Sequence, residues 1–175
     1  MAAEWPIIKR GDQDQAVRTL QHLLNHHGTS LEADGVFGPA TEEAVKHFQA
    51  ARGLVRDGVA GPATWESLVV ELAVGASGEA VKALQVQLYV RGTLPTVDGE
   101  YGVRTDIAVR RFQVFRGLQA DGVVRADTWQ TLLGTAYIPM AGGEAGSALE
   151  EGNDWRSKLL AKIRPAGPNF KMPEG

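Results

Sequence analysis

The chain has 175 residues and a mass of 18.8 kDa, and 43% of its residues are hydrophobic, which excludes a wholly disordered chain and suits one ordinary domain or two small ones. Its 18 Lys and Arg against 21 Asp and Glu leave a formal charge of -3, so no overall basic field attracts nucleic acid or anionic lipid. It contains no Cys, which excludes disulfides, thiolate nucleophiles and sulfur-ligated zinc.

The N-terminal segment, MAAEWP, has neither the basic region nor the apolar stretch of a signal peptide. No segment approaches the roughly 18 consecutive apolar residues that cross a membrane. The sequence therefore predicts a protein that is cytoplasmic as synthesised and does not insert into a membrane.

Two copies of one unit make up most of the chain. A shift of 64 positions aligns residues 11–69 with residues 75–133 without a gap, and roughly 25 of about 59 positions are identical. We therefore predict one repeat in residues 1–72, a second in 73–138, and a tail in 139–175. Each unit is near the lower size limit for a fold that stands alone.

Three helices are expected in each copy. The first stripe, Val17, Leu20 and Leu24, has the i, i+3, i+7 spacing of a helix and recurs 64 residues later. Second and third stripes follow at residues 44–48 and 65–69, and again at 108–112 and 129–133. Pro39 and Pro62 each follow a Gly, which is typical of a first helical position.

This pattern predicts an all-α fold of two tandem, small three-helix bundles. Four aromatic side chains are expected in their cores: Phe48, Trp65, Phe112 and Trp129.

The tail predicts a flexible linker over residues 139–152 and then a short C-terminal helix. Trp155, Leu159 and Ile163 share one stripe of that helix, and Pro165 ends it. About ten residues do not form a stable helix alone in water, so the stripe needs a covering surface. We expect it to dock on a partner protein; packing against the chain's own repeats is the alternative.

Each unit carries the motifs DGxFGxxT, FQxxRGL and DGVxGPxTW, or close variants, in that order. In this it resembles the peptidoglycan-binding-domain-1 family, a three-helix module often joined to bacterial cell-wall hydrolases. The resemblance covers about residues 9 to 134 and implies non-catalytic adhesion to peptidoglycan. The second unit departs from the pattern at Val103, Arg125 and Ala126, where the first has Pro39, Gly61 and Pro62.

The loops that enter the second helix of each unit are the candidate ligand sites. A loop beside a helix N-terminus presents free N–H groups to a carboxylate or an acetamido oxygen. The alternative is structural, with Asp forming the turn, Gly supplying a positive φ and the aromatic side chain filling the core. The candidates are Asp34, Gly35, Phe37, Gly38, Thr41, Asp98, Gly99, Tyr101, Gly102 and Thr105, with Asp57 and Asp121 at the second turn of each unit.

Two further kinds of side chain offer contacts to a ligand. Arg52 and Arg116 could bind a ligand carboxylate, or could instead pair with Asp57 and Asp121. Tyr89 and Trp5 have faces suited to stacking on sugar, or they simply pack.

A catalytic site is not indicated. His22 and His26 are one helical turn apart, but no HExxH motif surrounds them, so we interpret these residues and His27 as surface-facing side chains rather than metal ligands. The acidic pairs recur as turn residues, and no GxSxG marks a nucleophile. We expect no enzyme activity, no metal and no cofactor.

The leading hypothesis is a protein that binds peptidoglycan and anchors a partner or assembly to the cell wall. The alternative is an adaptor in a phage-tail-like or contractile injection assembly that reuses the repeats for protein–protein contacts and is released with it. Neither hypothesis includes a nucleic-acid partner.

Overall fold

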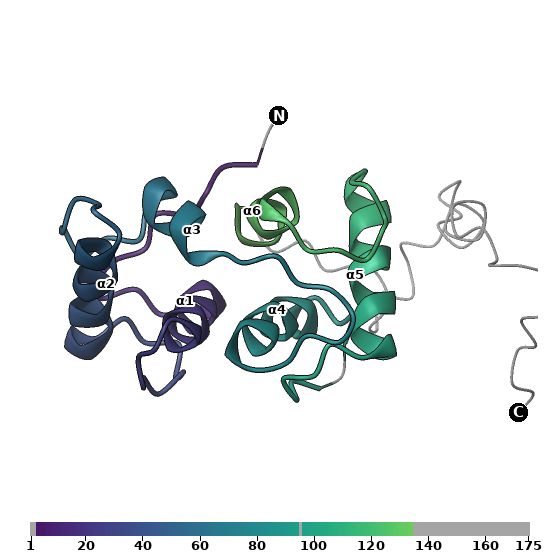
Figure 1. Ribbon diagram of the computed structural model, residues 1–175, viewed down its shortest axis with the longest axis horizontal. Helices are drawn as coiled ribbons and strands as arrows, with labels where there is room; N and C mark the ends of the chain where they lie inside the picture. Colours follow the sequence, from purple (N-terminus) through teal and green to yellow (C-terminus); the bar gives the residue numbers. More distant parts are fainter. Residues whose placement is uncertain (1–2, 95, 135–175) are drawn as a thin grey trace, which may run out of the picture.

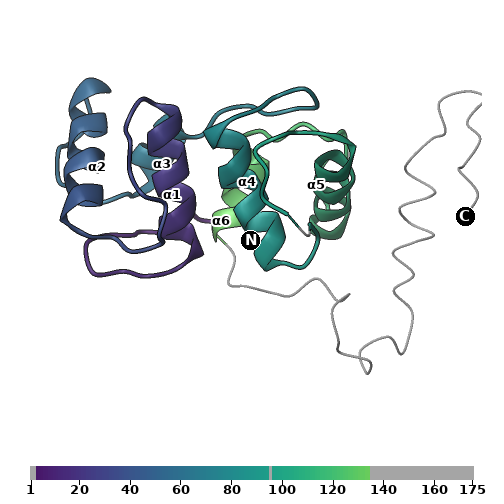
Figure 2. The same ribbon diagram turned by 90° about the horizontal axis from the view of Figure 1, so that it is seen from below.

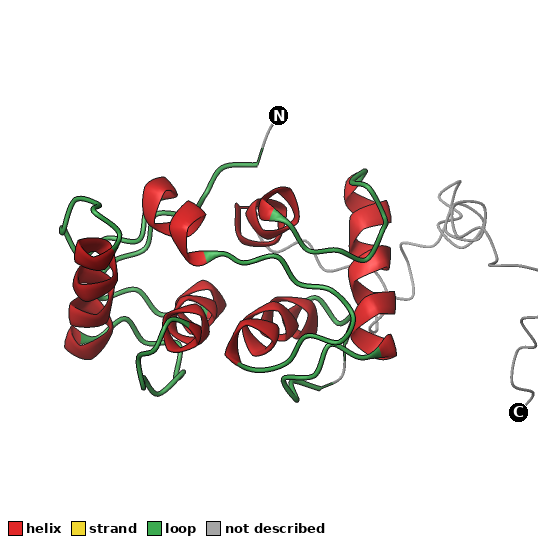
Figure 3. Cartoon of the chain, in the orientation of Figure 1, coloured by secondary structure: helices red, strands yellow, loops and turns green. Residues whose placement is uncertain are grey.

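The structure is a computed structural model that describes residues 3–94 and 96–134. Within that part of the chain the fold is all-α and has no strands, as predicted (Figures 1 and 3). The predicted linker and C-terminal helix, with Trp155, Leu159 and Ile163, lie outside the described residues. The helices are α1 (Gln15–His26), α2 (Pro39–Ala51), α3 (Pro62–Leu68), α4 (Glu79–Val90), α5 (Val103–Arg116) and α6 (Ala126–Gly134).

The helix starts follow from local chemistry. Asp14 is the N-cap of α1, and its Oδ1 accepts the N–H of Val17 at 2.9 Å. The helices α2 and α3 have extended Gly N-caps followed by Pro at the first helical position, which confirms both predicted starts. In the second repeat α5 and α6 start without Pro at the equivalent places.

Each repeat has a hydrophobic core, and the four predicted aromatic side chains, two from each repeat, are buried. The indole N–H of Trp65 donates to the carbonyl of Pro6 at 2.8 Å, and that of Trp129 donates to the carbonyl of Val70 at the same distance. Trp5 is also buried and stacks on Trp65, with ring centroids 6.3 Å apart, so it packs and is not free to bind sugar.

The two repeats pack against each other through α1 and α4, which run in opposite directions (Figure 2). His22 near the end of α1 contacts Glu79 at the start of α4, while Gln87 near the end of α4 donates to Oγ1 of Thr19 at 2.8 Å. The buried side chains of both repeats form one continuous core. Figure 1 shows α2 and α5 at opposite ends of the described part.

No helix within residues 3–94 and 96–134 combines the length and the apolar character needed to cross a membrane.

Candidate ligand-binding site

Four Asp-Gly turns, two in each repeat, connect consecutive helices, and a buried Gln anchors each turn. In the first turn, Nε2 of Gln21 donates to Oδ1 of Asp34 at 2.8 Å, to the carbonyl of Val36 at 3.1 Å and to Oγ1 of Thr41 at 3.2 Å. Its Oε1 accepts the N–H of Gly35 at 2.9 Å. One side chain of α1 therefore satisfies donors and acceptors of the turn and of the start of α2.

The same anchor recurs at the other turns, where the Gln side chains accept the N–H of the turn Gly: Gln49 from Gly58, Gln85 from Gly99, and Gln113 from Gly122. Sequence reasoning missed these Gln residues. A signal was available, because each Asp-Gly pair follows a Leu-Gln or Phe-Gln pair at one of two fixed separations. The four turns also place their Gly at a φ between +74° and +80°, a conformation that a side chain would strain.

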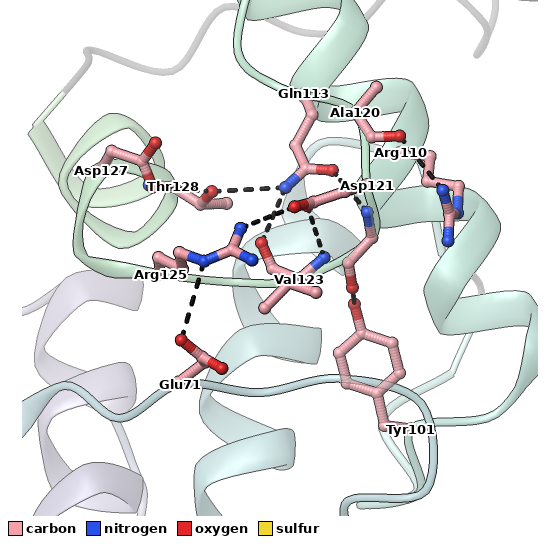
Figure 4. A network of polar contacts seen from close by, with 11 residues as sticks. Glu71, Tyr101, Arg110, Gln113, Ala120, Asp121, Val123, Arg125, Asp127 and Thr128 are labelled. Carbon is pink, nitrogen blue, oxygen red and sulfur yellow. Dashed lines mark hydrogen bonds and ion pairs between the residues drawn. The ribbon is translucent and has the colours of Figure 1, made fainter.

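The fourth turn shows how the turns are joined to the rest of the fold (Figure 4). The hydroxyl of Tyr101, from the third turn, donates to the carbonyl of Gly122 at 2.7 Å. Arg125 donates to Asp121 at 2.7 Å and lies 3.6 Å from a carboxylate oxygen of Glu71, on the segment between the repeats. Burial raises the pKa of the Tyr101 phenol above its ordinary value, so this hydroxyl stays protonated and keeps its donor role.

The turns favour the ionised form of their carboxyl groups. The backbone N–H two residues on, at 2.9 Å, and then the anchoring Gln lower the pKa of Asp34, Asp57 and Asp98. At Asp121 burial raises the pKa, but hydrogen bonds from the backbone and from Arg125 outweigh burial and lower it overall. These carboxylates are thus acceptors within the fold.

The structure gives most of the predicted site residues a place inside these turns. Phe37 and Tyr101 are buried, with exposed fractions of 1% and 2%, so their rings face the core. Gly38 and Gly102 are the N-caps of α2 and α5. The Asp, Gly and Thr residues form the network around the anchoring Gln. Ligand contact by any of them stays a prediction.

One pocket brings part of the predicted set together. It has a volume of about 170 Å³ and lies beside the third turn, at the start of α5. Asp98, Gly102 and Thr105 of the predicted site line it. The other lining residues are Gln85, Leu94, Thr96, Glu100, Val103 and Arg104.

Arg104 is the cation of this pocket, and sequence reasoning did not single it out. Its side chain is exposed and makes no hydrogen bond or ion pair with another described residue, although its charge helps to lower the pKa of Asp98. The first N–H groups of α5 lie at the positive end of the helix dipole, and the residues that begin this helix line the pocket. The first repeat has Ala40 at the equivalent position, so the two copies of the loop differ in charge.

The two predicted Arg contacts have different surroundings from those expected. Arg52 lies over the ring of Phe48, 5.1 Å from its centroid, and donates to Nδ1 of His27 at 3.2 Å. The alternative in which Arg52 pairs with Asp57 is therefore wrong. Arg116 lies over the rings of two Phe residues on α5, at 5.7 Å from each centroid, and Asp121 pairs with Arg125 instead.

The interpretation of His22 as a surface residue is wrong. Its side chain is buried because α4 of the second repeat covers that face of α1, and Nδ1 lies 2.7 Å from Oε2 of Glu79. Burial raises the pKa of Glu79, but hydrogen bonds from His22 and Lys82 outweigh burial and lower it overall. His26 is exposed, as predicted.

His27 is half-buried rather than surface-facing, and its Nε2 lies 2.9 Å from the carbonyl of Leu68. Burial lowers the pKa of His27, and the charges of His26 and Arg52 add to this effect against the opposing hydrogen bond to Leu68. Among the described residues, no group of three or more His, Asp or Glu side chains could hold a metal ion.

Fold and turns together define a tandem pair of three-helix modules with repeated Asp-Gly turns. The sequence matches the model of the family described as putative peptidoglycan binding domain over residues 13–68 and again over 77–132. These two ranges cover more than half of the chain. The protein belongs to this family, which confirms the resemblance and its two copies.

Similar proteins include an amidase and a carboxypeptidase. The chain is 32% identical over 124 residues to a probable N-acetylmuramoyl-L-alanine amidase of Bacillus licheniformis, an alignment that covers 69% of this chain and 34% of the amidase. It is 47% identical over 64 residues to the zinc D-Ala-D-Ala carboxypeptidase of Streptomyces albus G, covering 35% of this chain and 25% of the carboxypeptidase.

Among solved structures, the Burkholderia AP3 phage endolysin is similar, with 28% identity and a TM-score of 0.37 over 61% of this chain and 37% of the endolysin. The chain spans about half or less of the length of the curated relatives that it matches.

Proposed function

We propose that this protein binds peptidoglycan without cleaving it, and that the pocket beside the third turn takes a carboxylate of a stem peptide. The observation that carries the first part is membership of the peptidoglycan-binding family over two tandem ranges. The match covers only 34% of the amidase and 25% of the carboxypeptidase, so their activities do not transfer with it.

The chemistry of the pocket supports the second part. Arg104 is an unpaired guanidinium at its rim, and a guanidinium binds a carboxylate through two parallel hydrogen bonds. The N-terminal N–H groups of α5 add donors for the same anion. The carboxylate of Asp98 lines the same pocket and suits an amide N–H of a peptide, because the bonds within the turn use only its Oδ1.

The electrostatics of the turns supports the absence of glycoside cleavage by their carboxyl groups. A general acid for glycoside cleavage needs a carboxyl group whose pKa is raised, so that it is protonated at neutral pH. The surroundings of Asp34, Asp57 and Asp98 lower their pKa values instead. Carboxylates that are already engaged with backbone N–H groups act as turn acceptors and not as proton donors.

Co-sedimentation with purified sacculi tests the proposal. The variant Arg104→Ala places at this position the residue that the first repeat has, Ala40, so the fold accommodates it. We expect the affinity for sacculi to fall about tenfold, the equivalent of about 1.4 kcal/mol. Arg56→Ala is the matched control, because Arg56 is an exposed Arg of the first repeat that does not line the pocket.

Three results would contradict parts of the proposal. If wild-type protein does not pellet with sacculi, peptidoglycan binding fails. If soluble muropeptides appear in the supernatant, the non-catalytic part fails. Equal loss of pelleting in the Arg104 and Arg56 variants would indicate non-specific charge attraction and would remove the pocket from the proposal.

A second candidate function is an adaptor that holds an assembly, such as a phage-tail-like or contractile injection apparatus. One observation favours protein contacts: Val103, Ile107 and Phe115 on α5 are 71%, 50% and 47% exposed, whereas the residue equivalent to Ile107 on α2 is Glu43. Arg104, exposed at the start of α5, adds a positive charge that fits a partner protein with acidic side chains.

In this second candidate the tail residues Trp155, Leu159 and Ile163 are the docking segment. Deleting residues 153–175 should leave folding and sacculus binding intact and abolish association with the assembly. A lower melting temperature without loss of any partner would favour packing of the tail on the repeats and contradict the docking role.

A further inference from the structure

A second pocket, of about 300 Å³, lies where the two repeats meet. The helix α1 contributes Gln15 and Arg18 from the first repeat. From the second repeat, α4 and the loop after it contribute Val86, Tyr89, Thr96 and Val97. Because both repeats supply its walls, this groove exists only in the tandem arrangement.

The polar groups of the groove are available to a ligand. The side chains of Arg18 and Gln15 make no hydrogen bond or ion pair with another residue in the described ranges, and the same holds for the hydroxyl of Tyr89. The Tyr89 side chain is 55% exposed. The groove thus combines one aromatic face, aliphatic walls, an amide and an unpaired guanidinium.

The repeat provides an internal comparison for these residues. A shift of 64 positions relates Gln15 to Glu79 and Arg18 to Lys82, and it relates the buried His22 to Val86. At the equivalent end of the α1–α4 contact, Glu79 binds both Lys82 and His22 at 2.7 Å. Glu79 and Lys82 are therefore paired within the fold and are not available to a ligand.

At the groove, replacement of the His by Val86 leaves Gln15 without such a partner, and Arg18 stays unpaired. Tyr89 stands where the first repeat has Asn25, whose side chain bonds to the backbone at Leu31. Packing of the repeats therefore accounts for one end of the contact and leaves the groups of the other end unexplained.

We propose that this groove binds the muramic acid residue of a peptide-free glycan strand, a sugar whose lactyl ether carries a free carboxylate. This inference rests on the proposed function and names the part of peptidoglycan that the groove takes. The ring of Tyr89 stacks on the C–H face of the sugar, the Arg18 guanidinium binds the lactyl carboxylate in bidentate fashion, and Gln15 hydrogen-bonds the acetamido group.

The position of the groove fits an extended ligand. Thr96 lines both this groove and the pocket beside the third turn, so the two sites adjoin. The volume of the groove lies at the lower end of the range of about 300 to 1,000 Å³ for small-molecule sites, which suits one sugar residue. A glycan strand in the groove would extend toward the pocket that Arg104 lines.

Nuclear magnetic resonance titration of the full chain tests this assignment with two matched sugars. The first probe is the disaccharide of N-acetylglucosamine and N-acetylmuramic acid with its free lactyl carboxylate. The second is diacetylchitobiose, which has the same sugar rings without the lactyl group. We expect the first to shift the signals of Tyr89 and Arg18 and to bind about tenfold more tightly than the second.

The test variants carry the residues of the equivalent positions, so the fold accommodates them: Tyr89→Asn matches Asn25, and Arg18→Lys matches Lys82. Tyr89→Asn should weaken disaccharide binding about tenfold, and Arg18→Lys should reduce the preference over chitobiose because a Lys ammonium lacks the planar fork. Arg56→Ala should bind as wild type does. Thermal unfolding of each variant checks that folding is unchanged.

Equal binding of the two sugars, or wild-type binding by Tyr89→Asn, would overturn the inference. So would a free stem peptide that shifts the Tyr89 signal while the disaccharide does not, since that result assigns the groove to peptide. Sacculus pelleting separates this inference from the proposed function. Pelleting without a response to the disaccharide refutes only the groove, and disaccharide binding without pelleting refutes only the proposed retention on the wall.

Discussion

The anchoring of the Asp-Gly turns can be tested at Gln49, which is buried and lies outside both pockets. Its Nε2 donates to the carbonyl of Val59 at 2.9 Å, and its Oε1 accepts the buried N–H of Gly58 at 3.0 Å. The substitution Gln49→Leu fills a similar volume but makes neither bond. It also leaves Oδ1 of Asp57 without its Gln donor, although that carboxylate is exposed to water.

The expected loss follows from these groups. The buried N–H of Gly58 is left without a partner, which costs about 1 to 3 kcal/mol. The carbonyl of Val59 keeps the N–H of Gly61 at 3.1 Å, so the lost bond to Gln49 costs only about 0.5 to 1.5 kcal/mol there. The added aliphatic surface of Leu offsets about 1 kcal/mol, so the net loss in the free energy of unfolding is about 1 to 3 kcal/mol. That is a large fraction of the roughly 5 to 15 kcal/mol typical of a folded domain.

Urea denaturation monitored by helical circular dichroism measures the loss as a lower midpoint at constant slope. Gln119→Leu is the matched control, because Gln119 is exposed in the turn after α5 and should change the free energy by less than about 0.5 kcal/mol. A loss of under about 0.5 kcal/mol for Gln49→Leu as well would refute the role of the Gln as an anchor.

Three further predictions concern the core, acid stability and binding. Phe112→Ala should lower the free energy of unfolding by about 3 to 5 kcal/mol in the same assay, because the ring is buried; unchanged melting would contradict the core assignment. The pKa of Glu79 is lowered in the folded protein, so ionised Glu79 stabilises the fold fully above its unfolded pKa of about 4.3. That stabilisation is lost as pH falls through the lower folded pKa. Denaturation at successive pH values should therefore show a smaller loss of stability in this acid range for Glu79→Gln than for the wild type. Asp98→Asn keeps an acceptor for the turn and should retain helical circular dichroism while sacculus pelleting weakens; loss of both together would assign Asp98 to the turn alone.

The sequence predicts the features that show as a repeated spacing of apolar residues or as a residue preference at a helix end. The stripe of Val17, Leu20 and Leu24 predicts α1 because apolar spacing reports the buried face directly. Pro39 and Pro62 mark helix starts because a missing N–H is tolerated only there. The repeat then carries each prediction into the second copy, even where Val103 replaces the Pro.

No local sequence pattern predicts the packing of the two repeats against each other. Thr19 and His22 lie on the face of α1 that α4 covers, and both are polar residues that a pattern of burial assigns to solvent. Their burial depends on specific partners, Gln87 and Glu79, that are 68 and 57 residues away in the chain. A hydropathy pattern does not reveal such pairs. Each side chain is polar, and it is buried only because its partner forms a hydrogen bond with it.

The candidate site divides in the same way between what the two repeats share and what distinguishes them. Asp34 and Asp98 occupy equivalent turns and make equivalent bonds, so the turn geometry by itself accounts for their presence in both copies. The turn engages Oδ1 of each carboxylate, so only Oδ2 is left for a ligand at Asp98.

The unpaired guanidinium of Arg104 and the exposed ring of Tyr89 stand where the copies differ. Arg104 replaces an Ala, Tyr89 replaces an Asn, and Val86 replaces the His that would have used the neighbouring polar group. A duplicated fold needs the same residues twice for its stability, but it needs a ligand contact only where a ligand binds. Differences between equivalent exposed positions are therefore a stronger guide to binding in this protein than the motifs that the copies share.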